Sequence, residues 1–100
     1  MITIPATFEL GGRTWQVRLS NEPEAGKPDT MGLCMSHEAT ILLQRGMTPE
    51  ETQHTFYHEL CHAICYTLGW DKLNEDEDRI DALGGLIYQF LKRKKGKLNG

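Results

Sequence analysis

The sequence predicts an α+β fold in which a small antiparallel sheet of two N-terminal hairpins packs on two helices. Three observations lead to this fold class. Apolar and polar residues alternate in the first part of the chain, turn-forming residues interrupt this alternation, and the second half has apolar residues at helical spacing. The length of 100 residues suits one domain, residues 1–100, with a single core.

Two hairpins are expected in the N-terminal part of the chain. In residues 2–19, apolar and polar residues alternate on both sides of the glycine pair at 11–12, which is typical of a hairpin turn. Residues 32–43 are expected to form the second hairpin, with a polar turn at 36–39. Residues 20–30 lack periodicity and are rich in Asn, Glu, Pro and Gly, so they are predicted to form a surface loop.

A first helix is expected to begin near residue 48, where the sequence contains a typical helix-start pattern. The segment 48–51, Thr-Pro-Glu-Glu, is typical of a helix start, because Thr48 can act as the N-cap and Glu51 can complete a capping box. This helix is expected to run to about Leu68, with Gly69 as its C-terminal stop.

The second helix is expected to follow Asn74 as its N-cap, with Glu77 at the capping-box position. Acidic residues at its start and the basic residues 92–95 at its end suit the two ends of the helix dipole. The pair Gly84-Gly85 lies in its middle, where each glycine costs up to about 1 kcal/mol relative to alanine. Close approach of the first helix would explain this cost.

Composition limits the classes of function. The net charge of -3 and the hydrophobic fraction of 39% indicate an ordinary soluble chain and argue against general nucleic-acid binding. The N-terminus lacks the basic and apolar regions of a signal peptide, and no segment approaches the ~20 apolar residues of a membrane span. Cys34, Cys61 and Cys65 are expected to be free thiols, so a cytoplasmic location is expected.

The motif His-Glu-x-x-His at residues 58–62 is the strongest indication of chemistry. His58 and His62 are spaced by four residues, so both imidazoles lie on one helix face and can reach a single cation. Glu59 lies about 100° further round the helix, where a general base for an attacking water is needed. The pattern therefore predicts a zinc (Zn2+) site with Glu59 as the catalytic residue.

A catalytic zinc site usually has three protein ligands, so a third must come from elsewhere in the chain. The second helix offers Glu77 and, one turn later, Asp81. Glu77 is expected to bind the metal, and Asp81 is expected to accept a hydrogen bond from the second nitrogen of a ligating imidazole. Glu75, Asp78 and Cys65 remain alternative third ligands, although Cys65 also fits a small buried core residue.

Other polar residues have simpler interpretations. His54 lies one turn before the motif and could borrow the metal, but an exposed position is expected, and His37 is expected to be a solvated turn residue. The basic run 92–97 is expected to be a solvated helix end, with contact to nucleic acid or to an acidic partner as the alternative. Tyr66 and Tyr88 lie too far along their helices from the motif residues, so no oxyanion donor is assigned.

These motifs resemble those of a known family. H-E-L-C-H at residues 58–62, followed by Glu77-x-x-x-Asp81, resembles the gluzincin pattern of thermolysin-like zinc peptidases. The layout of most of the chain is similar to that of small phage-encoded and bacterial minimal zincins, including ImmA/IrrE-like metallopeptidases. The resemblance implies a zincin-like fold and hydrolysis of an extended or unfolded peptide substrate in a bacterial cytoplasm. The residues that it implies are the zinc ligands His58, His62 and Glu77, the general base Glu59 and the supporting Asp81.

Two other classes of function stay open. A metal-stabilised binding or regulatory module would keep a zincin fold without useful turnover, and an interaction protein would use the basic end of the chain. For a peptidase, the resemblance implies that a substrate strand adds to a sheet edge next to the metal helix. Residues 39–43 immediately precede that helix and are the expected edge.

Overall fold

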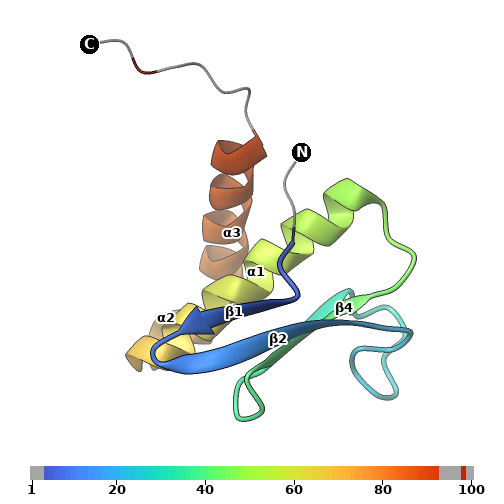
Figure 1. Cartoon of the computed structure of the whole chain (residues 1–100), viewed down its shortest axis with the longest axis horizontal. Coiled ribbons are helices and arrows are strands. Elements are labelled where there is room, and N and C mark those ends of the chain that lie inside the picture. Colours follow the sequence, from blue (N-terminus) through green and yellow to red (C-terminus); the bar gives the residue numbers. More distant parts are fainter. Residues whose placement is uncertain (1–3, 93–97, 99–100) are drawn as a thin grey trace.

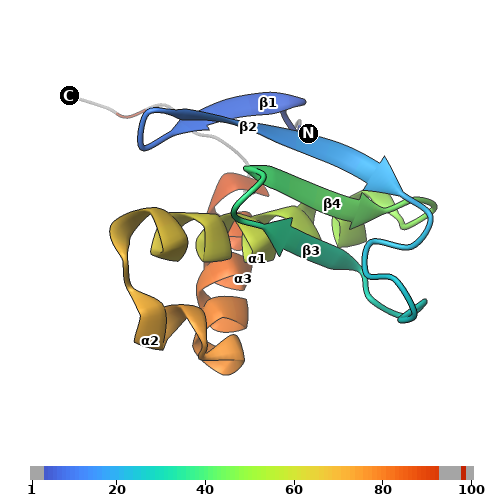
Figure 2. The same cartoon turned by 90° about the horizontal axis from the view of Figure 1, so that it is seen from below.

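The computed structural model describes residues 4–92 and residue 98, which form a small α+β fold. The elements, in chain order, are β1 (Thr7–Leu10), β2 (Arg13–Ser20), β3 (Gly32–Met35), β4 (Thr40–Gln44), α1 (Pro49–Leu68), α2 (Asp71–Asn74) and α3 (Glu77–Lys92). The strands form one mixed sheet, and the helices lie on one face of it (Figures 1 and 2). Helix α1 packs on the sheet, and α3 crosses α1. None of the helices in the described part combines the length and apolar surface that a bilayer crossing requires.

The sheet has the strand order β1-β2-β4-β3. β1 is antiparallel to β2 and β3 is antiparallel to β4, whereas β2 and β4 run parallel, with Val17 opposite Ile41. The expectation of a wholly antiparallel sheet was therefore wrong for the central pair. In the interior strand β4, Thr40, Ile41 and Leu43 are buried, whereas the residues of the edge strand β3 are half-buried.

This order also changes the edge beside α1. The expected edge, residues 39–43, is wrong, because β4 is paired on both sides. Within the described residues, β3 forms the edge on this side of the sheet and β1 forms the opposite edge. The Met31 carbonyl accepts a hydrogen bond of 2.8 Å from Gln44 N–H. Because bonded and non-bonded pairs alternate along an antiparallel ladder, Gly32 and Cys34 direct their N–H and C=O groups away from β4.

Helix α1 contributes to two clusters of buried side chains. The cluster toward the sheet includes Trp15, Ile41, Leu43, Phe56 and Ala63. The cluster toward α3 consists of Cys61, Cys65 and Ile80. Cys65 is 2% exposed, in agreement with its interpretation as a core residue. Because each fully buried large apolar side chain contributes about 1.5–3 kcal/mol, these clusters hold α1 firmly between the sheet and α3.

Gly84 allows α3 to cross α1 at close range. A Cβ atom at this position would lie 2.9 Å from both the N and Cα atoms of His58. These are backbone atoms, which cannot turn aside as the end of a side chain can, so a larger residue would push the two helices apart. The predicted close approach is therefore confirmed for Gly84. At Gly85, an added Cβ would meet His54 Nε2 alone, at 3.3 Å.

The start and end of α1 agree with the prediction. Glu51 N–H donates to Thr48 Oγ1 at 3.1 Å, and Thr48 N–H donates to Glu51 Oε1 at 3.0 Å, which completes the capping box. The helix ends at Leu68, and Gly69 follows in the left-handed conformation with φ of 72°. The helix that bears the His-Glu-x-x-His motif is thus defined by local signals at both ends.

The second helix begins later than predicted. Asn74 does not cap it, because Asn74 is the last residue of α2 and α3 begins at Glu77. The Asp76 carboxylate accepts a hydrogen bond of 3.2 Å from the backbone N–H three residues later and takes the capping role. At the other end, Lys92 is the last residue of α3, and the rest of the predicted basic end, residues 93–97, lies outside the described residues.

Replacing Thr48 with alanine is expected to lower the free energy of unfolding by about 1 kcal/mol, because the N–H of Glu51 loses its acceptor at the start of α1. Chemical denaturation of the variant and the wild type measures the difference. Thr48→Ser keeps the hydroxyl and is expected to stay close to the wild type. Equal losses in both variants would contradict a capping role for the hydroxyl.

Candidate metal centre

Two histidines on one face of α1 form the base of the site. His58 and His62 are separated by one helical turn, and their ring centroids lie 5.2 Å apart. Their side chains are mostly buried, with exposed fractions of 19% and 15%. Burial and helical spacing together hold the two imidazoles close to each other, as the motif predicts.

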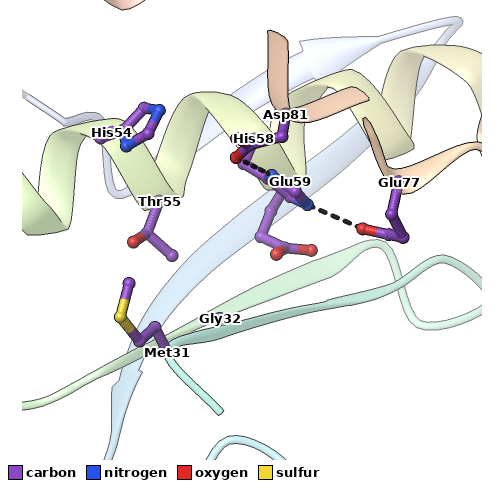
Figure 3. Close-up of a pocket in the computed structure, with 8 residues that line it drawn as sticks. All are labelled: Met31, Gly32, His54, Thr55, His58, Glu59, Glu77 and Asp81. Carbon is purple, nitrogen blue, oxygen red and sulfur yellow. Dashed lines mark hydrogen bonds and ion pairs between the residues drawn. The ribbon is translucent and has the colours of Figure 1, made fainter. Parts of the chain in front are cut away.

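Glu77, the first residue of α3, reaches both histidines. Its carboxylate oxygens lie 3.1 Å from His58 Nε2 and 3.0 Å from His62 Nε2, and Figure 3 shows the first of these contacts. One ligand-type atom from each of the three residues lies within 4.8 Å of the other two, so the three together could hold a metal ion. Asp81 follows one turn later on the same helix, and both carboxylates reach α1 because Gly84 allows the close crossing.

The second nitrogen of each imidazole has its own partner. His58 Nδ1 lies 3.0 Å from Asp81 Oδ1, and His62 Nδ1 lies 2.5 Å from Asn74 Oδ1. Both partners are oxygen acceptors, so each Nδ1 carries the proton and each Nε2 is directed at Glu77. The sequence predicted a hydrogen bond from a histidine to Asp81. It did not predict the one to Asn74, because Asn74 was interpreted as a helix cap.

The arrangement of acceptor atoms calls for a cation. When the Nδ1 proton is donated to Asp81 or Asn74, a neutral imidazole presents the lone pair of Nε2 to Glu77, and the carboxylate also presents lone pairs. Such atoms repel one another at about 3 Å unless a positive charge lies among them. A proton on an imidazole or a metal ion can supply that charge.

Glu59 lies beside this cluster without joining it. It points between α1 and β3, close to Gly32 (Figure 3), and is 8% exposed. Burial raises the pKa of Glu59 above its ordinary value, and the neighbouring His58 and His62 oppose this increase in part. A buried carboxylate next to, but not within, a potential ligand set has the place that the motif predicts for a general base.

The pKa of His58 is raised for a different reason. Burial disfavours the imidazolium, but the hydrogen bond to Asp81 and the negative charges of Glu59 and Glu77 outweigh burial and raise the pKa above 6.5. His58 therefore keeps a proton more readily than an isolated histidine does.

A groove runs along β3 and past the cluster. It consists of two adjoining hollows that share Gly32, Glu59 and Glu77 in their walls. The first hollow is also lined by Met31, His54, Thr55, His58 and Asp81. The second is also lined by Glu24, Leu33, Cys34, Ser36, His62 and Asn74. The groove thus brings the sheet edge, the carboxylate of Glu59 and the histidines together.

Other candidate residues lie outside the cluster of ligand atoms within the described part of the chain. Glu75 and Asp78 flank the third member in sequence but do not converge with the histidines, and Cys65 is buried in the core. His54 is partly buried rather than exposed, and its ring packs against Tyr88 with centroids 5.9 Å apart.

His37 makes a contact that sequence reasoning did not predict. It is an exposed residue of the turn between β3 and β4, as expected, but its Nδ1 lies 3.5 Å from Tyr66 Oη near the end of α1. No sequence signal links these two residues, since they come from elements that meet only in the folded chain.

The raised pKa of His58 predicts a pH-dependent stability of the zinc-free protein. The ion pairs of His58 are present below pH 6.5 and are lost as the pH rises through the higher pKa of the folded state. NMR titration of the imidazole should therefore give a pKa above 6.5, and Asp81→Asn should lower it. Asp78→Asn is the control, since this carboxylate makes no contact with His58. A titration of His58 at or below 6.5 in the wild type would contradict the assignment.

The chain was compared with protein families, curated proteins and solved structures. No family model, no curated protein and no solved structure matches the chain. The resemblance to minimal zincins stays a prediction from the motifs at residues 58–62 and 77–81.

Proposed function

We propose that this protein is a zinc-dependent metallopeptidase of the minimal zincin type, in which His58, His62 and Glu77 hold the metal. The main support is that two imidazole nitrogens and a carboxylate converge within 4.8 Å beside the buried carboxylate of Glu59. Two nitrogen ligands and one oxygen ligand suit zinc and leave a fourth position for water or substrate. The three unpaired cysteines suit the reducing cytoplasm of a bacterial host, where we propose that the protein acts.

Each residue has its own role in the proposed hydrolysis. When bound, zinc supplies a water of lowered pKa and polarises the peptide carbonyl. Glu59 takes a proton from the attacking water and delivers it to the nitrogen of the leaving amine. Its raised pKa suits the first of these steps, because a carboxylate whose pKa lies closer to neutrality is a stronger base and takes the proton from the water more readily. Asp81 and Asn74 keep the two imidazoles in the ligating tautomer.

The groove suits an extended or unfolded peptide as the substrate. Gly32 and Cys34 direct backbone N–H and C=O groups away from β4, so a peptide can pair with β3 as an added strand. Glu59 and Glu77 line the same groove. A peptide paired with β3 would therefore have one of its bonds next to the proposed base Glu59 and the metal held by Glu77. The proposed substrate edge is thus β3 rather than the interior strand β4.

A metal-stabilised binding module is the second candidate function. The cluster joins two residues of α1 to the first residue of α3. A bound ion would therefore hold the two helices together and stabilise the domain whether or not any peptide is cleaved.

Each chain is expected to bind one zinc ion, and Glu77→Ala should weaken that binding most, because it removes a ligand. Asp81→Ala and Asn74→Ala should weaken it by about 10- to 100-fold, since these residues support the ligands. Glu75→Ala is the matched control, a nearby carboxylate outside the cluster, and should change affinity little. Competition with a chromophoric chelator measures all four variants. A large loss in Glu75→Ala with none in Glu77→Ala would exclude the proposed ligand set.

Glu59→Gln tests the peptidase function directly. The amide has nearly the same size as the carboxylate but cannot accept the proton, so cleavage should slow by at least about 100-fold while zinc binding is retained. Mass spectrometry of a library of unfolded peptides measures cleavage, and elemental analysis measures zinc. Undiminished cleavage by the variant would exclude Glu59 as the base. Zinc binding by the wild type with no cleavage of any peptide would favour the binding module.

The zinc-loaded Glu59→Gln variant also locates the peptide. Because it binds substrate without consuming it, an added peptide should slow hydrogen exchange of the outward amides of Gly32 and Cys34. The amides of β1, the opposite edge of the sheet, serve as the internal control. Slower exchange at β1 with no change at β3 would place the peptide elsewhere.

A further inference from the structure

Gly32 brings the edge strand β3 into contact with the helix that bears Glu59. A Cβ atom at Gly32 would lie 2.5 Å from Thr55 Cγ2, 3.1 Å from Glu59 Cγ and 3.3 Å from Glu59 Oε2. Gly32 is not among the residues with positive φ, so lack of space rather than backbone conformation requires a glycine here. The missing side chain therefore sets how closely β3 approaches α1 at Glu59.

We propose that Gly32 is a positioning residue for Glu59: the bare backbone of the edge strand leaves the room in which the carboxylate lies beside the histidines. This role rests on the proposed peptidase function. Glu59 is 8% exposed and lies between α1 and β3 (Figure 3), so its side chain has little free space in which to avoid an added methyl group. Such a group would move the carboxylate or separate β3 from α1.

Thr55 offers a competing explanation that the test must remove. Its Cγ2 is the atom nearest to the added Cβ, it is 6% exposed, and a β-branched side chain in a helix has little rotamer freedom. A loss of function in Gly32→Ala could therefore arise from Thr55 alone. Serine at position 55 keeps the hydroxyl but lacks Cγ2, so a Thr55→Ser background leaves the contact with Glu59 as the remaining conflict.

The expected defect lies in turnover rather than in substrate binding. The N–H and C=O groups of Gly32 are directed along the sheet, away from β4, whereas an added Cβ would be directed at α1. Alanine at this position therefore keeps the backbone groups that would pair with a peptide. A displaced Glu59 would act on the attacking water less effectively. The contacts at 3.1 and 3.3 Å require Glu59 to move by a few tenths of an ångström, and since about 1 Å can cost about 100-fold in rate, such a shift should cost about 3- to 5-fold.

The first measurement compares Gly32→Ala with its parent, both in the Thr55→Ser background. We expect kcat to fall by about 3- to 5-fold, with little change in KM or in zinc affinity. Gly85→Ala is the matched control, because its added Cβ would meet only the end of the His54 side chain, and its kcat should stay unchanged. An unchanged kcat in Gly32→Ala would overturn the proposal. A fall in kcat together with a similar rise in KM and a similar loss of zinc affinity would also overturn it, because these changes would indicate general distortion. If the zinc-loaded wild type cleaves no peptide, the peptidase function fails, and the next measurement decides the role of Gly32 alone.

The second measurement uses the stability of the zinc-free protein and no activity. In the Thr55→Ser background, Gly32→Ala should lower the denaturation midpoint, and the decrease should shrink when Glu59→Ala makes room for the added methyl group. The cycle also covers a Gly32→Ala variant that does not fold, since Glu59→Ala should then restore folding. An equal decrease with and without the Glu59 side chain would show that Gly32 does not act through Glu59.

Discussion

The close crossing of α3 over α1 determines where the carboxylates of the candidate site lie. At Gly84 an added Cβ would come within 2.9 Å of the His58 backbone, so the two helix backbones are nearly in contact. Glu77 precedes Gly84 by seven residues, or about two turns, and therefore lies on the same side of α3. The distance between its carboxylate and the two imidazoles is thus a consequence of backbone packing, with Asp81 carried into place by the same contact.

The electrostatics of the cluster follow from this geometry. Several acceptor atoms converge from α1, α3 and the end of α2, and two of them, from Asp81 and Asn74, already take the Nδ1 protons. The remaining lone pairs favour a cation. In the metal-free protein a proton on His58 can supply the positive charge, in agreement with the raised pKa of His58. The pKa of Glu59 is raised chiefly by burial, with a smaller contribution from the negative charge of Glu77.

Helix α1 is approached closely from two directions, each time by a glycine. Gly84 lets α3 approach at His58, and Gly32 lets β3 approach at Glu59. The first contact positions the potential ligands, and the second positions the potential base. Both parts of the candidate site are thereby arranged around one helix. The position of β3 follows in turn from the strand order, in which the more buried β4 lies inside the sheet.

Local patterns in the sequence were enough to predict the features that depend on neighbours along the chain. The capping box of Thr48 and Glu51, the stop at Gly69 and the shared face of His58 and His62 all follow from helix geometry, which repeats every 3.6 residues or so. Glu77, Asp81 and the close approach at Gly84 could be predicted for the same reason, since each follows from the face of one helix.

Tertiary structure decided the features that depend on competition between distant partners. β2 pairs with β4 in parallel, and the alternation of apolar and polar residues within each strand does not specify which strands become neighbours. Asn74 could cap a helix or bind an imidazole, and the path of the chain after Gly69 brings it to His62 instead. In the sequence, Gly32 has only the features of a strand end. The lack of space that requires a glycine there is due to Thr55 and Glu59, which are more than twenty residues away in the chain. Contacts of this kind depend on the packed positions of whole elements, which no local pattern specifies.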